Sequence, residues 1–216
     1  SFTTSSSIGS QKDDIVLITS TDLWCPARSY YYKGELQPIL SSSSNIYTIG
    51  DTFFDSYTSS TTTVYNLAMP TIEISGLEFI MNGYLFALNL QYIKNVKVID
   101  CKIHGARYAA LQLFYCYGGL IQNNFIYDVW QVGTGTSYGV SVSSSQNIKV
   151  VNNNIIEARH CITTGGNEPS RCHIYEGNTC YSHPSQLQNW SIDTHGNTEF
   201  ITCLLYTSPS PRDGLL

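Results

Sequence analysis

Apolar and polar residues alternate in short segments along most of this chain, and the segments recur at a near-constant spacing. One set of apolar stretches begins at Ile74, Val98, Leu120, Val150 and Ile174, which are 24, 22, 30 and 24 positions apart. A second set of alternating stretches lies between them, at Phe86–Gln91, Ala110–Phe114, Gly139–Ser143 and Cys161–Thr164. Such alternation is typical of strands, and no segment keeps a helical spacing over three turns. Each repeat therefore predicts at least two short strands that meet at corners.

A repeat of this length predicts stacked units, because one unit is too small to bury its own apolar face. The layout matches one rung of a parallel β-helix, so the predicted fold class is all-β. The 30-residue unit fits the same scheme with a longer corner, from Tyr127 to Tyr138. Asn124, Asn154 and Asn178 share one register, and Asn tolerates the left-handed backbone of a sharp corner. We expect these three side chains to form a hydrogen-bonded column.

The repeat divides the chain into three regions. Residues 1–66 are expected to lead into the solenoid: they hold the apolar strand Ile15–Ile18, and the Ser- and Thr-rich stretch 41–66 is expected to form exposed polar loops or edge strands. Residues 67–201 are expected to form the rungs. Residues 202–216 break the repeat, and Leu204–Asp213 resembles a translated sequencing-adaptor read-through from a metagenomic assembly. We therefore expect a non-native tail and a fragment truncated at both ends.

Composition narrows the function classes. Only 12% of the 216 residues are charged and the formal net charge is -5, which argues against a nucleic-acid partner because such a protein needs a basic stripe. The sequence contains no run of 18 apolar residues, so it predicts no membrane insertion. The seven cysteines form no CxxC pair and predict structural thiols, with no metal site. No other cofactor is predicted.

The rungs, the Asn column and the corner loops resemble the right-handed parallel β-helix of the pectate-lyase superfamily. Within it, the chain is most similar to bacteriophage tail-spike and tail-appendage proteins, and Ala27–Glu35 resembles the segment that precedes the rungs in some of them. The resemblance covers about residues 12 to 200. It implies a location in the phage virion, a homotrimer and a bacterial surface polysaccharide as partner; a secreted protein is the alternative location.

Alternation along each strand also predicts which side chains face outward. If Leu111, Val140, Ile162 and Ile192 point into the core, an outer polar strip contains Gln112, Ser141, Thr163 and Asp193. His195, Arg159 and Cys161 are predicted on the same outer side, whereas strict alternation turns His160 inward.

The candidate catalytic set consists of Arg159, Asp193 and His195 of the strip, together with His160. Asp193 and His195 lie two positions apart, so the carboxylate can orient the imidazole for general acid–base catalysis. Arg159 supplies a cation for a sugar carboxylate or for developing negative charge. In a hydrolase, Asp193 would instead work with Glu157 or Asp128. The structural alternative is that the Asp–His pair only hydrogen-bonds a neighbouring rung.

The candidate substrate-binding residues are Gln112, Asp128, Trp130, Tyr138, Ser141, Thr163 and Trp190. The corner from Tyr127 to Tyr138 is the predicted substrate wall, because aromatic faces stack on sugar rings and loops on a rigid scaffold carry binding.

These features predict a tail-spike-like protein that binds and depolymerises a bacterial surface polysaccharide, as a lyase or a glycoside hydrolase. One alternative is a tail or surface protein that only binds glycan. The other is a secreted bacterial pectate-lyase-like enzyme, which usually needs a calcium cluster of carboxylates; the strip holds mainly amides and hydroxyls before Asp193.

Overall fold

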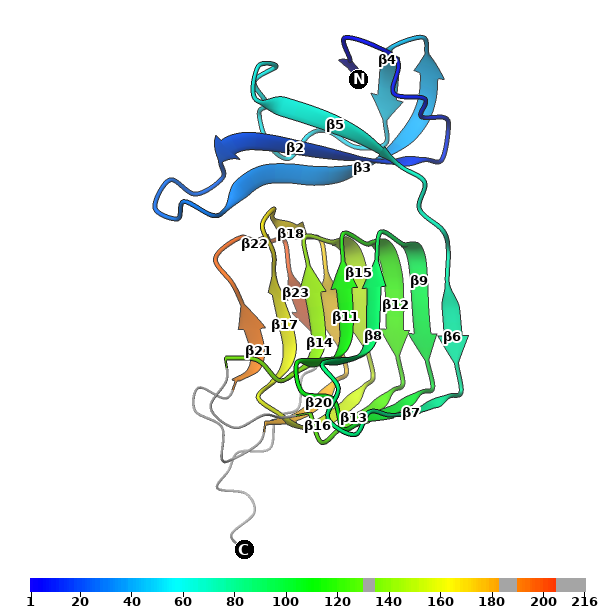
Figure 1. Ribbon diagram of the computed structural model, residues 1–216, viewed down its shortest axis with the longest axis vertical. Helices are drawn as coiled ribbons and strands as arrows, with labels where there is room; N and C mark the ends of the chain where they lie inside the picture. Colours follow the sequence, from blue (N-terminus) through cyan, green and yellow to red (C-terminus); the bar gives the residue numbers. More distant parts are fainter. Residues whose placement is uncertain (130–134, 183–189, 205–216) are drawn as a thin grey trace, which may run out of the picture.

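The computed structural model describes residues 1–129, 135–182 and 190–204, and these residues form strands and no helix. Figure 1 shows two parts: an antiparallel sheet from the N-terminal residues lies along one side of a stack of parallel rungs. The stack is a β-solenoid of about 5 turns, which confirms the predicted parallel β-helix.

The N-terminal residues form a sheet in which the predicted strand at Ile15–Ile18 is joined by strands of the stretch 41–66 and by others that were not predicted. Its five strands are β1 (Phe2–Thr3), β2 (Ile15–Leu23), β3 (Tyr32–Ser43), β4 (Ile46–Ile49) and β5 (Thr62–Leu67), in the order β1-β4-β3-β2-β5. The continuous apolar run at the start of β2 exists because both faces of the sheet are covered. Ile15 and Leu17 pack toward Tyr115 of the solenoid, whereas Val16 and Ile18 pack with Tyr47 on the other face.

Three parallel sheets form the solenoid. The first contains β6 (Glu73–Ser75), β9 (Lys94–Ile99), β12 (Tyr117–Gln122) and β15 (Gln146–Val151), followed by β18 (Ser170–Arg171), β19 (Ile174–Glu176), β22 (Thr198–Glu199) and β23 (Thr202–Leu204). The second contains β7 (Glu78–Ile80), β10 (Lys102–His104), β13 (Phe125–Tyr127), β16 (Asn154–Ala158) and β20 (Thr179–Ser182). The third contains β8 (Phe86–Gln91), β11 (Ala109–Phe114), β14 (Tyr138–Ser143), β17 (His160–Gly165) and β21 (Trp190–Thr194).

The core of the solenoid contains the predicted inward residues, with one systematic exception. Leu111, Val140 and Ile162 are fully buried in one apolar cluster, as predicted. Cys161 was predicted on the outer face, but it belongs to the same cluster. Two successive residues face the interior where each of these strands begins, so a prediction from strict alternation is wrong there. The same shift turns His160 away from the core, against the prediction. The seven cysteines all lie among the described residues, and none of them forms a disulfide bond.

The cross-rung register differs by one residue from the sequence alignment in two rungs. Ile74, Val98, Ile121, Val150 and Tyr175 are the true neighbours. The alignment had used Leu120 and Ile174 in place of Ile121 and Tyr175. The corner asparagines shift with it: the column consists of Asn124, Asn153 and Asn178, and Asn154 is exposed.

The asparagine column forms a continuous set of buried hydrogen bonds. Asn124 Nδ2 donates to Asn153 Oδ1 at 2.9 Å, and Asn153 Nδ2 donates to Asn178 Oδ1 at 3.0 Å. The backbone N–H of Cys101 donates to Asn124 Oδ1 at 2.9 Å, which extends the column to the preceding rung. The left-handed residue of each corner is the one before, as at Asn123 (φ 55°) and Asn152 (φ 53°). That backbone turn directs the next amide into the corner.

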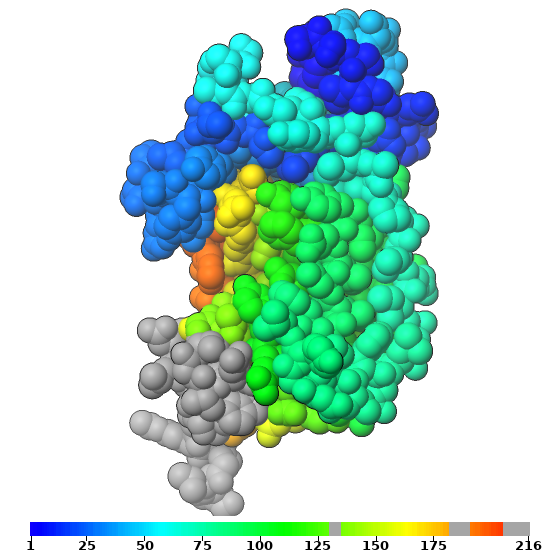
Figure 2. Space-filling view, in the orientation of Figure 1, coloured from blue at the N-terminus to red at the C-terminus, as the bar shows by residue number. Residues whose placement is uncertain are grey.

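Arg171 connects the N-terminal sheet to the last rungs. Its guanidinium is fully buried and contacts Asp55 Oδ2 and Glu199 Oε2, each at 2.5 Å. Its Nη1 also donates to the carbonyl of Gly34 in β3 at 2.9 Å. One side chain thus joins three segments that are distant in sequence. Figure 2 shows the result, with the blue N-terminal residues against the yellow and orange residues of the last rungs.

We expect Asn153→Ala to lower the free energy of unfolding by about 3 kcal/mol, because buried donors and acceptors left unpaired cost about 1–3 kcal/mol each. The matched control is Asn154→Ala, one position away and exposed, which should change stability by about 0.5 kcal/mol or less. Urea unfolding of both variants measures the difference. Equal losses would contradict the register described above.

We expect Arg171→Met to destabilise the protein by about 2 kcal/mol, less than the roughly 3–5 kcal/mol of a fully buried pair because Asp55 and Glu199 are partly solvated. Amide hydrogen exchange in β2 and β3 should become faster, while the rungs keep their protection. Lys97→Met is the control, since Lys97 forms an exposed pair with Glu73 at 3.0 Å. Unchanged exchange in the N-terminal sheet would show that Arg171 does not hold it.

Candidate functional site

The outer face of the third sheet presents a polar column. Asn89, Gln112, Ser141, Thr163 and Asp193 are direct cross-strand neighbours on β8, β11, β14, β17 and β21. Each follows an inward-facing Leu, Val or Ile, so alternation sends its side chain outward. The strands stack at about 4.8 Å, and the column is therefore a straight line of amides, hydroxyls and one carboxylate along the solenoid axis.

A hollow of about 270 Å³ opens over this column. Gln112, Tyr138, Ser141, Thr163 and His195 line it, together with Tyr108, Phe114, Ser143 and the loop at 165–167. Small residues keep it open: a Cβ on Gly165 would lie 3.2 Å from the His195 ring, and one on Gly166, whose φ is +126°, would collide with Ser144. We call this hollow, with the adjoining Asp193, the groove.

Aromatic rings form one wall of the groove, where the strands of the third sheet begin. Tyr138 stacks on His160 with ring centroids 5.7 Å apart and an interplanar angle of 11°. Tyr108 meets Tyr138 edge-on at 5.7 Å, and Phe86 lies 4.9 Å from Tyr108. Tyr108 is not among the residues predicted from the sequence. It directly precedes Ala109, the cross-strand neighbour of Phe86 and Tyr138, and this position beside two aromatic residues is the signal that could have identified it.

The carboxylate of Asp193 lies close to two histidine rings at the end of the column. Its Oδ2 lies 3.1 Å from His195 Nε2 and 3.5 Å from His160 Nε2. His160 is almost completely buried, whereas the side chain of His195 is 45% exposed. When His195 Nε2–H donates to Asp193, the lone pair is on Nδ1, which faces Gly165 at the edge of the hollow. The arrangement can therefore accept a proton from a molecule in the groove.

Arg159 lies behind the aromatic wall. Its Nη1 donates to the carbonyl of Gly135 at 2.8 Å, and the Tyr138 hydroxyl donates to the same oxygen at 2.7 Å. Burial raises the pKa of Tyr138, and the nearby Arg159 opposes this rise only in part. The Tyr138 phenol thus keeps its proton at neutral pH. Arg159 itself is buried, so protein groups rather than water surround its side chain.

The structure separates one predicted residue from the rest. Asp128 does not line the groove; it lies at the corner between the second and third sheets, where it lines a second hollow with Asn82, His104 and Arg107. Trp130 lies outside the described residues. The backbone of Trp190 pairs with His160, and its side chain is outside the described part.

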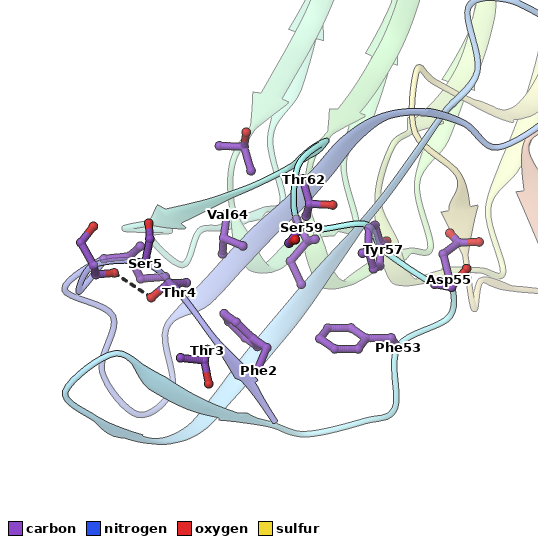
Figure 3. Close-up of a pocket in the computed structure, with 15 residues that line it drawn as sticks. Phe2, Thr3, Thr4, Ser5, Phe53, Asp55, Tyr57, Ser59, Thr62 and Val64 are labelled. Atoms are coloured by element: carbon purple, nitrogen blue, oxygen red, sulfur yellow. Dashed lines mark hydrogen bonds between the residues drawn. The ribbon is translucent and has the colours of Figure 1, made fainter.

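A larger hollow, of about 590 Å³, lies on the N-terminal sheet and not at the groove. Figure 3 shows Phe2, Phe53, Tyr57 and Val64 around it, with hydroxyl groups of Ser and Thr residues. Its lining carries no histidine or lysine, and Asp55, which faces Arg171, is its one carboxylate among the described residues. Within the same described ranges, no three His, Cys, Asp or Glu side chains gather closely enough to hold a metal ion.

No protein-family model matches this sequence, and no curated protein matches it either. Solved structures do. The tailspike protein gp49 of Pseudomonas phage LKA1 aligns with a TM-score of 0.75 and 22% identity, over 92% of this chain and 35% of that one. Tailspike gp61 of Pseudomonas phage phi297 aligns with a TM-score of 0.80 and 20% identity, over 93% and 36%. This chain shares the fold of phage tailspike proteins.

A third similar structure is the Gp54 tailspike of Acinetobacter baumannii bacteriophage AP22, solved in complex with an A. baumannii capsular saccharide. It aligns with a TM-score of 0.77 and 22% identity, over 94% of this chain and 34% of that one. The chain therefore spans about a third of the length of each of these tailspikes. Among the described residues there is no helix long and apolar enough to cross a membrane.

Proposed function

We propose that this protein belongs to the tail of a phage virion, where it binds a bacterial surface polysaccharide along the groove. The observation that carries the proposal is the groove itself: a polar floor beside an aromatic wall, on a fold shared with tailspikes, one of which was solved with a capsular saccharide. Assembly as a homotrimer is part of the proposal, by likeness to tail spikes.

The side chains on the floor of the groove have donors and acceptors available for a ligand. The side chains of Gln112, Ser141 and Thr163 make no hydrogen bond within the described part of the chain, although Ser141 and Thr163 are only 4% and 5% exposed. Sugar hydroxyls both donate and accept, as these three side chains do. The rings of Tyr108 and Tyr138 offer the apolar contact that a pyranose face requires. A regular stack of rungs repeats these groups along a line, which suits a polymer.

Cleavage of the bound polymer is the second function we propose, because Asp193 orients an exposed histidine at the groove. The described geometry favours β-elimination over hydrolysis. Of the three carboxylates considered for hydrolysis, Asp193 alone adjoins the groove. Asp128 and Glu157 are left-handed residues of the corner between the second and third sheets, and neither lines the hollow. A hydrolase needs two carboxyl groups that flank one bond.

In this elimination, His195 Nδ1 takes the proton from C5 of a uronic acid residue, next to its carboxylate. The electron pair forms the C4–C5 double bond, the C4–O4 glycosidic bond breaks, and O4 takes a proton from Tyr138, which stays protonated at neutral pH. Arg159 lies behind the aromatic wall, so its positive charge acts across Tyr138 on the developing negative charge, without contact to the sugar carboxylate. Solvent returns the proton from His195 to Tyr138, so no water is consumed by the cleavage.

Filling the groove should abolish binding. Ser143 lines the hollow and is half-buried, so Ser143→Trp places an indole in it without overpacking the core. We expect affinity for a recognised capsular polysaccharide to fall more than about tenfold, which corresponds to about 1.4 kcal/mol. Leu77→Trp adds the same bulk at an exposed corner and should leave affinity unchanged. Biolayer interferometry on immobilised polysaccharide compares them; equal affinities would contradict binding in the groove.

Asp193→Asn should lower the rate of cleavage by about 10²–10⁴-fold, the usual contribution of general acid–base catalysis, while binding persists. Asp100→Asn is the control, since Asp100 is an exposed corner residue of the first rungs. Absorbance of unsaturated sugars and assays of new reducing ends follow the reaction. A rise in both supports a lyase and reducing ends alone support a hydrolase. Binding without either product identifies a non-enzymatic glycan-binding protein.

A further inference from the structure

A second hollow, of about 330 Å³, opens at the corner between the second and third sheets. Its lining includes Asn82, Gly83, His104, Gly105, Arg107 and Asp128. Stacked left-handed residues build this corner: φ is 44° at Asn82, 78° at Gly105 and 52° at Asp128. Backbone hydrogen bonds join them across the rungs, from Gly83 N to Gly105 O at 2.8 Å and from Gly105 N to Asp128 O at 3.1 Å. The backbone of the site is therefore rigid.

Arg107 is the cation of this hollow. Its guanidinium makes no ion pair or hydrogen bond within residues 1–129, 135–182 and 190–204. By contrast, Arg171 is paired with two carboxylates and Arg159 donates to a carbonyl. The Arg107 side chain lies flat on Gly83, where a Cβ would be 2.8 Å from Nε and 3.0 Å from Nη2. Glycine at this position lets the guanidinium rest on the backbone and face the hollow.

The other polar groups around Arg107 are of complementary kinds. Neither the Asn82 amide nor the Asp128 carboxylate has a side-chain partner in the described part of the chain. His104 is held in place, because its ring stacks on Tyr127 with centroids 4.5 Å apart and its Nε2 lies 3.5 Å from Glu78. One cation, one amide and one carboxylate thus surround an open volume that a single sugar residue can occupy.

We propose that this hollow is a second saccharide site, which binds a carboxylate-bearing sugar residue of the polymer held in the groove. The planar guanidinium of Arg107 forms bidentate hydrogen bonds with the sugar carboxylate, and Asp128 and Asn82 bind its hydroxyls. Arg107 directly precedes Tyr108 of the groove wall, so the two hollows flank the same corner. The inference rests on the proposed function and adds to it a second point of contact, outside the groove, that recognises a carboxylated sugar.

An array of bacterial capsular polysaccharides, with and without carboxylated sugars, tests the substrate class. We expect the bound members to contain a carboxylated sugar. Binding of neutral members alone would overturn this inference, and the β-elimination with it, and would leave the proposed binding of polysaccharide along the groove intact. Binding of no member would contradict the proposed function itself.

Variants of the protein, measured with the polysaccharide that binds most tightly, then test the site. We expect Arg107→Gln to weaken binding about 10–100-fold, since hydrogen bonds to charged groups contribute about 1.5–3 kcal/mol. The affinity of Arg107→Lys should lie between those of wild type and Arg107→Gln. Reducing the polymer's carboxyl groups to alcohols should weaken wild-type binding to the level of the variant and should not weaken the variant further. Lys12→Gln, an exposed cation of the N-terminal residues, is the control and should bind within about twofold of wild type. Unchanged affinity of Arg107→Gln, or additive losses from the variant and the reduction, would overturn the assignment.

Discussion

The register between rungs is the constraint on which every other feature of this structure depends. A shift of one residue would move each inward side chain to the outer face. The buried amides of Asn124, Asn153 and Asn178 oppose such a shift, because each amide can satisfy its neighbour and the adjoining backbone in one alignment only. The straight outward line from Gln112 to Asp193 is a consequence of that alignment, so the candidate site depends on a hydrogen-bonded column at another corner.

The N-terminal sheet affects the groove through its contacts with the last rungs. Tyr32 N donates to the carbonyl of Asn167 at 3.0 Å, beside the loop that closes one side of the hollow. Glu168 accepts a hydrogen bond from Tyr115 at 2.5 Å and lies against Gly34, where a side chain would collide with it. Arg171 then ties this junction to the final rung. The sheet therefore fixes the loop at 165–167 as well as covering an apolar face of the solenoid.

The sequence predicts the solenoid and much of the groove because these depend on local alternation repeated at a steady period. Gln112, Ser141 and Thr163 follow from it directly. The period cannot resolve a single residue in corners of unequal length, which is why Asn154 was predicted in place of Asn153. Alternation also fails where two successive residues turn inward, as at Cys161. The contacts of Arg171 join positions more than 100 residues apart, and no local pattern indicates them.

The charge of the protein limits how an acidic polymer could be recognised. With a formal net charge of -5, the chain as a whole repels such a polymer at long range. Favourable binding energy must then come from short-range groups that are fixed before the ligand arrives. Arg107 on Gly83 and Arg159 on the Gly135 carbonyl are both held in this way. Because salt screens long-range repulsion more than close bidentate contacts, affinity for an acidic polymer should rise or stay level, and not fall, when moderate salt is added.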